Sequence, residues 1–129
     1  MEVTRIFDLL GQDKEQQANS EYCDKGVALA HKVSGEWIKY SIDEYIENVN
    51  YVSYALLSLG IEPGDKVGIV SGNRPEWNFL DMGVMQIGAI PVPIYPTISQ
   101  EDYRYILNHA EVKLLFIEGK KKRKKIEPI

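Results

Sequence analysis

The residues of this chain with the clearest capacity for chemistry are six consecutive bases, Lys120–Lys125. Residues 1–119 carry nine Lys and Arg against eighteen Asp and Glu, whereas residues 120–129 carry six bases and one acid. This asymmetry indicates a basic tail on an acidic body. The run predicts either a solvated surface or a site that captures a phosphorylated ligand or an anionic lipid by charge. Nucleic acid is the weakest candidate partner, because no aromatic residue interrupts the run.

Two loops that follow predicted strands are further candidate sites. Ser71–Trp77 precedes a helix, so its backbone N–H groups could hold an anion; alternatively Asn73 or Arg74 caps the helix and Trp77 packs into the core. In Pro93–Thr97, either Tyr95 and Thr97 line a cleft, or Pro96 stiffens the loop and Thr97 or Ser99 caps the next helix. The sequence alone leaves both alternatives open.

The sequence predicts no metal site and no dinucleotide-binding or Walker-type phosphate loop. His31 and His109 have no His or Cys partner at ligand spacing, and neither glycine-rich motif is present. The single cysteine, Cys23, fits a reducing compartment. The acidic first residues do not resemble a secretory signal, and no apolar run approaches the ~20 residues of a membrane span. We therefore expect a cytoplasmic protein.

The elements that must position these residues begin with a short helix at Thr4–Leu10 and a loop at Gly11–Asn19. A hairpin follows, with strands at Val27–His31 and Glu36–Tyr40 around Ser34-Gly35. Ser41 and Glu44 have the spacing of a capping box, which predicts the start of a helix. An apolar stripe continues this helix, and Gly60 is expected to end it in a left-handed conformation. The stripe comprises Tyr45, Val49, Val52, Leu56 and Leu59.

The remainder alternates between strands and helices. Strands are expected at Val67–Val70, Ile90–Tyr95 and Leu114–Ile117, the second at a sheet edge because of its prolines. Pro75 begins one intervening helix, and Ser99 with Asp102 caps another that runs through Ala110. The buried face of the first is predicted to comprise Trp77, Leu80, Val84 and Ile87. The expected fold class is α/β: a three-layer parallel sheet with crossover helices, preceded by a β-hairpin.

Three parts of the chain are expected from this organisation. Residues 1–26 form an N-terminal helix and loop, residues 27–118 an α/β subdomain, and residues 119–129 the basic tail. The apolar residues are ample for so short a chain, and we expect some of the helical stripes to stay uncovered. Self-association through such a surface is therefore expected.

Four segments carry a resemblance to a known family. They are Trp37–Ser41, Leu59–Val67, Asn73–Trp77 and Gly88–Thr97. In this order and spacing they resemble the N-terminal part of the adenylation domain of AMP-forming acyl-CoA synthetases. The triplet Tyr95-Pro96-Thr97 is most similar to the long-chain fatty acid–CoA ligase branch. The resemblance covers residues from about Val27 to Ile117.

The resemblance implies a parent ligase that forms an acyl-adenylate from a fatty acid and ATP with Mg²⁺, then transfers the acyl group to coenzyme A. The family's phosphate loop and its catalytic residues have no counterpart in this sequence, which would stop before that loop. No catalytic residue is therefore assigned, and this segment alone is expected to be inactive and to bind none of these cofactors. The resemblance does place Thr97 and the bases Lys120, Lys121 and Lys122 on the coenzyme A side.

Two other functions stay open at this stage. The chain could be a free-standing α/β binding or interaction module that lacks the catalytic parts. It could also be an anion- or nucleic-acid-binding protein that acts through its basic tail. The same tail could make peripheral contact with a membrane.

Overall fold

The computed structural model describes residues 5–12 and 26–127 of the 129-residue chain. A short helix at residues 8–12 comes first. The labelled elements are β1 (Val27–Val33), β2 (Glu36–Ser41), α2 (Ile42–Ser58), β3 (Lys66–Val70), α3 (Pro75–Gln86), β4 (Ile90–Pro93), α4 (Gln100–His109), β5 (Val112–Ile117) and α5 (Gly119–Ile126). The predicted loop at Gly11–Asn19 is helical at residues 11–12, and residues 13–19 lie outside the described residues, as does Cys23.

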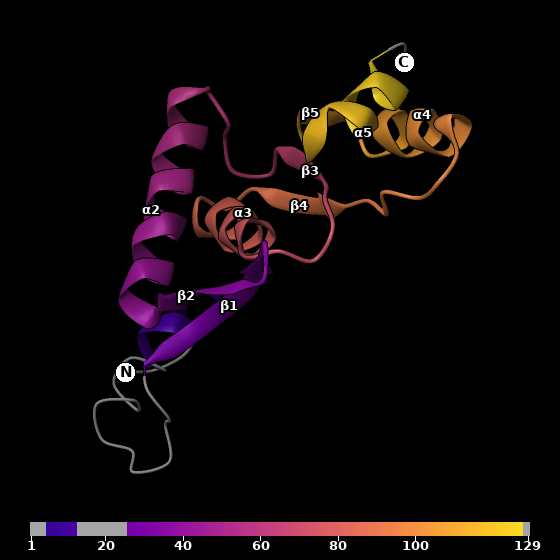
Figure 1. Ribbon diagram of the computed structural model, residues 1–129. Coiled ribbons are helices and arrows are strands. Elements are labelled where there is room, and N and C mark those ends of the chain that lie inside the picture. The colour runs from indigo at the N-terminus through magenta and orange to yellow at the C-terminus, as the bar shows by residue number, and fades with distance from the viewer. Residues whose placement is uncertain (1–4, 13–25, 128–129) are drawn as a thin grey trace.

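A parallel three-stranded sheet separates two layers of helices, which confirms the predicted α/β fold (Figure 1). The strand order is β4-β3-β5. On one face Val67 of β3 packs with Leu56 of α2 and Val84 of α3. On the other face Val70 packs with Tyr103 of α4 and Ile126 of α5. Helix α3 therefore crosses from β3 to β4 on one side, and α4 returns from β4 to β5 on the opposite side.

The two ends of α2 follow the sequence prediction. The Ser41 hydroxyl accepts the N–H of Glu44 at 3.2 Å, and the Glu44 carboxylate accepts the N–H of Ser41 at 2.7 Å. This reciprocal pair satisfies two N–H groups that the helix itself leaves unbonded. Beyond the last turn, Gly60 adopts a φ of 75°, as predicted. Leu59 was wrongly assigned to the buried stripe: it is the C-cap residue and is 62% exposed.

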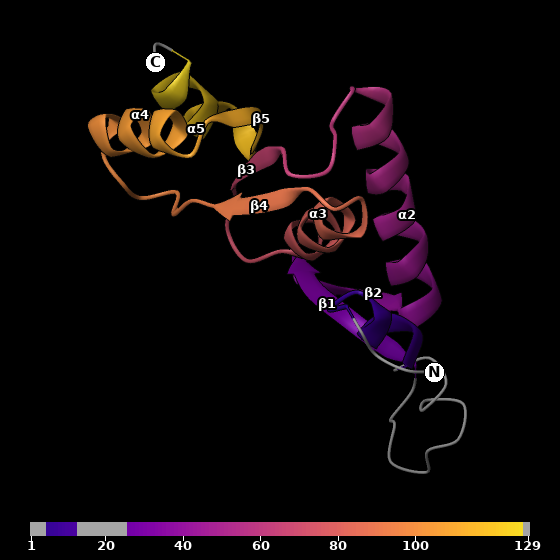
Figure 2. The same cartoon turned by 180° about the vertical axis from the view of Figure 1, so that it is seen from behind.

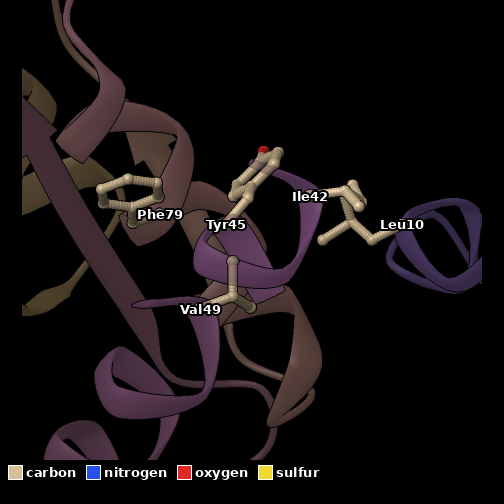
Figure 3. Close-up of a cluster of buried hydrophobic side chains, with 5 residues drawn as sticks. All are labelled: Leu10, Ile42, Tyr45, Val49 and Phe79. Carbon is tan, nitrogen blue, oxygen red and sulfur yellow. The ribbon is translucent and has the colours of Figure 1, made fainter. Parts of the chain in front are cut away.

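The buried face of α3 differs from the predicted one. Phe79 is buried there together with the predicted Val84, whereas Trp77 is only half-buried. Phe79 lies beside Tyr45 of α2, with ring centroids 5.6 Å apart (Figure 3). Gly83 also faces α2, where a Cβ atom would approach Val52 Cγ1 to 2.5 Å. The helix is therefore rotated so that its aromatic and glycine positions meet α2.

The antiparallel hairpin β1–β2 packs beside α3 and the N-terminal end of α2 (Figure 2). Its contact with α3 is aromatic, since Tyr40 and Phe79 meet edge to face at 5.3 Å. Leu10 of the short helix reaches Ile42 in the same cluster (Figure 3). The core on this side thus joins the N-terminal helix, the hairpin, α2 and α3.

The three parallel strands lie close to their predicted positions. Strand β4 is at an edge of the sheet and ends at Pro93, whereas the prediction extended it to Tyr95. Strand β5 begins two residues earlier than predicted, at Val112. Helix α4 begins with the predicted capping box, in which Ser99 Oγ accepts the N–H of Asp102 at 3.1 Å.

The predicted basic tail is helical. Residues 119–126 form α5, and Ile126 is 6% exposed where it packs against Tyr103. Part of the apolar surface expected to stay uncovered is covered, since Tyr45, Val49 and Leu56 of α2 lie in the core. Within the described residues, no helix is long and apolar enough to cross a membrane.

Candidate functional site

The carboxyl ends of the three parallel strands bring together the segments singled out from the sequence. Ser71 follows β3, Glu118 follows β5 and the loop Tyr95–Thr97 follows β4. Parallel strands end at one edge of a sheet, and ligands of α/β proteins bind at this edge. We therefore take this edge, with the N-terminal ends of α3 and α5, as the candidate site.

Glu118 is at the centre of the site. Its Oε2 atom accepts the backbone N–H of Gly72 at 2.8 Å and the hydroxyl of Ser71 at 3.4 Å. Its Oε1 atom accepts from Arg74 Nη1 at 3.1 Å, and Lys122 Nζ donates to Oε2. The Gly72 N–H, and next the ammonium group of Lys122, lower the pKa of Glu118 to about 2. The carboxylate is therefore charged at every physiological pH.

Arg74 is held by two carboxylates. Its guanidinium donates to Glu76 at 2.8 Å and 2.7 Å, in addition to its bond with Glu118. The Glu76 bonds raise the pKa of Arg74, and the pKa of Glu76 falls in return. Arg74 occupies the N-cap position of α3, but its side chain makes no capping hydrogen bond.

Neither interpretation of the loop Ser71–Trp77 is confirmed as stated, since no side chain caps α3 and Trp77 is only half-buried. A bound anion needs free N–H donors and unpaired positive charge. Here the Gly72 N–H and the Arg74 guanidinium are both bonded to carboxylates. These two groups are therefore occupied in this chain, and through Glu118 they join the start of α3 to the end of β5.

Two open cavities flank Trp77 at this edge. One of about 270 Å³ lies toward β5 and has apolar walls that include Ile69, Leu80 and Phe116. The other, of about 500 Å³, lies toward the exit of β4. Its lining comprises Ser71, Gly72, Asn73, Trp77, Pro93, Ile94, Tyr95 and Pro96. Tyr95 thus lines a cleft as one interpretation proposed, whereas Thr97 is exposed and outside that lining.

The structure separates the predicted site residues Lys120, Lys121 and Lys122. The first two are exposed on α5, whereas Lys122 is half-buried and bonded to Glu118. The base that approaches Thr97 is a different one: Lys125 Nζ donates to the carbonyl oxygen of Ile98.

Sequence reasoning missed Glu118, and it named Lys125 only as a member of the basic run Lys120–Lys125. The spacing of Glu118 to Lys122, four residues along a helix, is a signal that could have indicated one of these contacts.

Comparison with known proteins assigns the chain to a family. The model of the AMP-binding enzyme family matches residues 15–129. The chain is 32% identical over 115 residues to fatty acyl-CoA synthetase A of Dictyostelium discoideum, covering 89% of this chain and 17% of that protein. It is 37% identical over 86 residues to the long-chain-fatty-acid–CoA ligase FadD15 of Mycobacterium bovis, covering 67% of this chain and 14% of that ligase.

Solved structures agree on the fold. A fatty acyl CoA synthetase of Mycobacterium tuberculosis superposes with a TM-score of 0.76 at 23% identity, covering 97% of this chain and 23% of that one. VinN superposes with a TM-score of 0.80 at 16% identity, and the match covers 97% of this chain and 29% of VinN. The chain thus spans about a sixth of the length of the two curated relatives described above.

Proposed function

We propose, on the premise that this chain belongs to the AMP-binding enzyme family, that it forms the N-terminal scaffold of the adenylation domain of a long-chain fatty acid–CoA ligase. The observation that carries the proposal is the extent of the match. The family covers residues 15–129, and the relatives that are at least 32% identical over most of the chain are fatty acyl-CoA ligases. The named relatives extend far beyond this segment, so the catalytic groups are assigned to the rest of such a ligase.

In the parent ligase, ATP and a fatty acid would form an acyl-adenylate with Mg²⁺, and coenzyme A would then take the acyl group. The site described above supports a scaffold role in this reaction. Its charged groups neutralise one another through Glu118, and its nearest backbone donor is already bonded. Among the described residues, no cluster of three metal-ligating side chains occurs. The nucleotide and the metal would therefore be held by other parts of the ligase.

The coenzyme A side of the ligase is proposed to include Thr97, Lys120, Lys121 and Lys122. Support comes from their position, since Thr97 follows β4 and the lysines follow β5 at the same edge of the sheet. The exposed Lys120 and Lys121 have side chains free to meet a phosphate, whereas Lys122 would act by holding Glu118. The expected cytoplasmic location of the protein stays a prediction.

An ATP–pyrophosphate exchange assay tests whether this chain lacks the adenylation activity that is assigned to the rest of the ligase. The purified 129-residue chain is incubated with ATP, Mg²⁺, labelled pyrophosphate and a series of fatty acids. FadD15 of Mycobacterium bovis serves as the positive control. We expect no exchange above a blank from this chain, because the phosphate loop and the catalytic lysine of the family have no counterpart in its sequence. Exchange that rises with the amount of this chain, in protein free of host ligases, would refute the scaffold assignment.

A further inference from the structure

The outer face of the hairpin carries two lysines beside an exposed tryptophan. Tyr40 of β2 meets Phe79 in the core. Side chains alternate along a strand, so Trp37 and Lys39 lie on the face of β2 that points away from the core. Lys32 pairs with Trp37 across the hairpin, and its Nζ atom lies 5.8 Å from the centre of the indole ring. Trp37 is 62% exposed, and no ion pair joins either lysine to another described residue.

The outer face of α2 has the opposite character. Its exposed residues Glu47, Tyr51 and Tyr54 follow one another at intervals of four and three residues, so they form one line along the helix. Tyr51 donates its hydroxyl to the Glu47 carboxylate at 2.8 Å, and Tyr54 is 64% exposed. No base occurs between Ile42 and Ser58. This face is therefore acidic and aromatic, with no cation from its own helix to neutralise it.

We propose that the hairpin face of one copy of this chain binds the α2 face of a second copy, an interaction beyond the scaffold role. Ammonium groups pair with carboxylates and lie over tyrosine rings. Trp37 and Lys39 are about 7 Å apart along the strand. Tyr51 and Glu47 are about 6 Å apart along the helix, so an aromatic pair and a charged pair can form together. Tryptophan and tyrosine are also among the residue types that contribute most to protein interfaces.

The contact has to join two molecules. Tyr40 of the hairpin and Tyr45 of α2 both pack on Phe79, with ring centroids 5.3 Å and 5.6 Å away. The outer faces of the two elements point away from this shared core, so they cannot meet within one molecule. Because the two faces differ, each copy offers one of each, and the contact builds a ring or a chain of copies rather than a two-fold dimer.

Two variants that each lack one face test the proposal. Trp37→Ala/Lys39→Gln removes the hairpin face, and Glu47→Gln/Tyr54→Ala removes the α2 face. All four positions are exposed, and thermal melting checks that both variants fold. One variant carries a fluorescent label and is titrated either with the other variant or with itself. Fluorescence anisotropy measures binding at ionic strengths of about 0.1 M and about 1 M.

The mixed pair retains one intact hairpin face and one intact α2 face, so it should form a one-to-one complex. We expect this pair to bind at least about tenfold more tightly than either variant binds itself, and more weakly at the higher salt. The control variant is Glu101→Gln/Tyr105→Ala, which removes an exposed acid and an exposed tyrosine from α4, and it should self-associate like the wild type.

Three outcomes would overturn the proposal. The first is equal affinity in all the titrations, which pairing through the edges of the parallel sheet would give. The second is no binding of the mixed pair at the highest concentration reached. The third is a loss of self-association in the control variant as large as the loss in the two variants that lack a face.

Discussion

The carboxylate of Glu118 accepts the backbone N–H of Gly72 at 2.8 Å, joining residues that are 46 positions apart in the chain. This bond ties the end of β5 to the loop between β3 and α3. Because Lys122 also donates to Glu118, the same carboxylate positions the first turn of α5. One acidic side chain therefore connects three segments at this edge of the sheet: the end of β5, the loop before α3 and the first turn of α5.

The first prediction concerns acid stability. The pKa of Glu118 is about 2 in the folded chain, below its ordinary value of 4.5, chiefly because it accepts the Gly72 N–H. A lowered pKa contributes stability that is fully present above pH 4.5 and is lost as the pH falls toward 2. We therefore expect Glu118→Gln to melt below the wild type at neutral pH and the gap to shrink across this window.

Thermal melting followed by circular dichroism at a series of pH values measures that gap. Glu36→Gln, at an exposed position on β2, is the matched control and should show no comparable gap at neutral pH. A gap for Glu118→Gln that stays constant from neutral pH to pH 2 would show that the charge of Glu118 is not what stabilises the edge.

The second prediction tests the close approach of α2 and α3. The hydroxyl of Ser53 donates to the Gly83 carbonyl at 3.1 Å, and a Cβ atom on Gly83 would lie 2.5 Å from Val52 Cγ1. Gly83→Ala should destabilise the chain by about 1–3 kcal/mol through overpacking, measured by urea denaturation. Stabilisation instead, as expected for Gly to Ala in an exposed helix, would mean that the two helices are not in contact here.

The third prediction concerns the end of α2. Gly60 has a φ of 75°, and no atom lies near the place of an added Cβ, so substitution there acts through the backbone alone. Gly60→Val should lower the free energy of unfolding by about 1 kcal/mol or more, because branched side chains disfavour this conformation. Gly60→Asn is the control and should cost less, since Asn tolerates it. Equal losses in the two variants would contradict this explanation.

The fourth prediction is self-association of the isolated chain. Within the described residues, the outer edges of β4 and β5 pair with no strand. Leu114, Leu115 and Phe116 of β5 are only half-buried, although all are apolar. Such an edge is a template for pairing with a second copy. Light scattering should show a mass that rises with concentration, and a monomer mass at the highest concentration would contradict the prediction.

Local signals in the sequence were enough to predict the five strands, the helices α2, α3 and α4, and their order. The capping boxes at Ser41 and Ser99 act within four residues, and both were predicted correctly. The prolines of β4 indicated an edge strand, because proline removes a backbone donor, and β4 does lie at an edge.

The rotation of α3 was not predictable from its apolar residues. The apolar spacing placed Trp77 on the buried face together with Leu80, Val84 and Ile87, yet Phe79 is buried and Trp77 lines the two cavities. The rotation depends on Gly83, whose missing side chain lets Val52 of α2 approach. The spacing of apolar residues gives no information about such a contact, because glycine has no side chain to count in the pattern.

The candidate site could not be predicted in detail, because it is built from contacts between residues that are far apart in the sequence. Glu118 meets Ser71, Gly72 and Arg74 only because β5 pairs with β3 in parallel. Helix α5 was missed because a run of like charges disfavours a helix, whereas here Ile126 and the Glu118–Lys122 pair support it.

The most direct measurement of the scaffold assignment is the activity of a chimera. The segment of Dictyostelium discoideum fatty acyl-CoA synthetase A that this chain matches is replaced by the corresponding residues of this chain. The chimera is purified, checked for cooperative melting, and assayed for acyl-CoA formation from fatty acid, ATP and coenzyme A. We predict that the chimera forms acyl-CoA well above a blank, because this segment supplies the same scaffold. A chimera that melts cooperatively but forms no acyl-CoA would contradict the account.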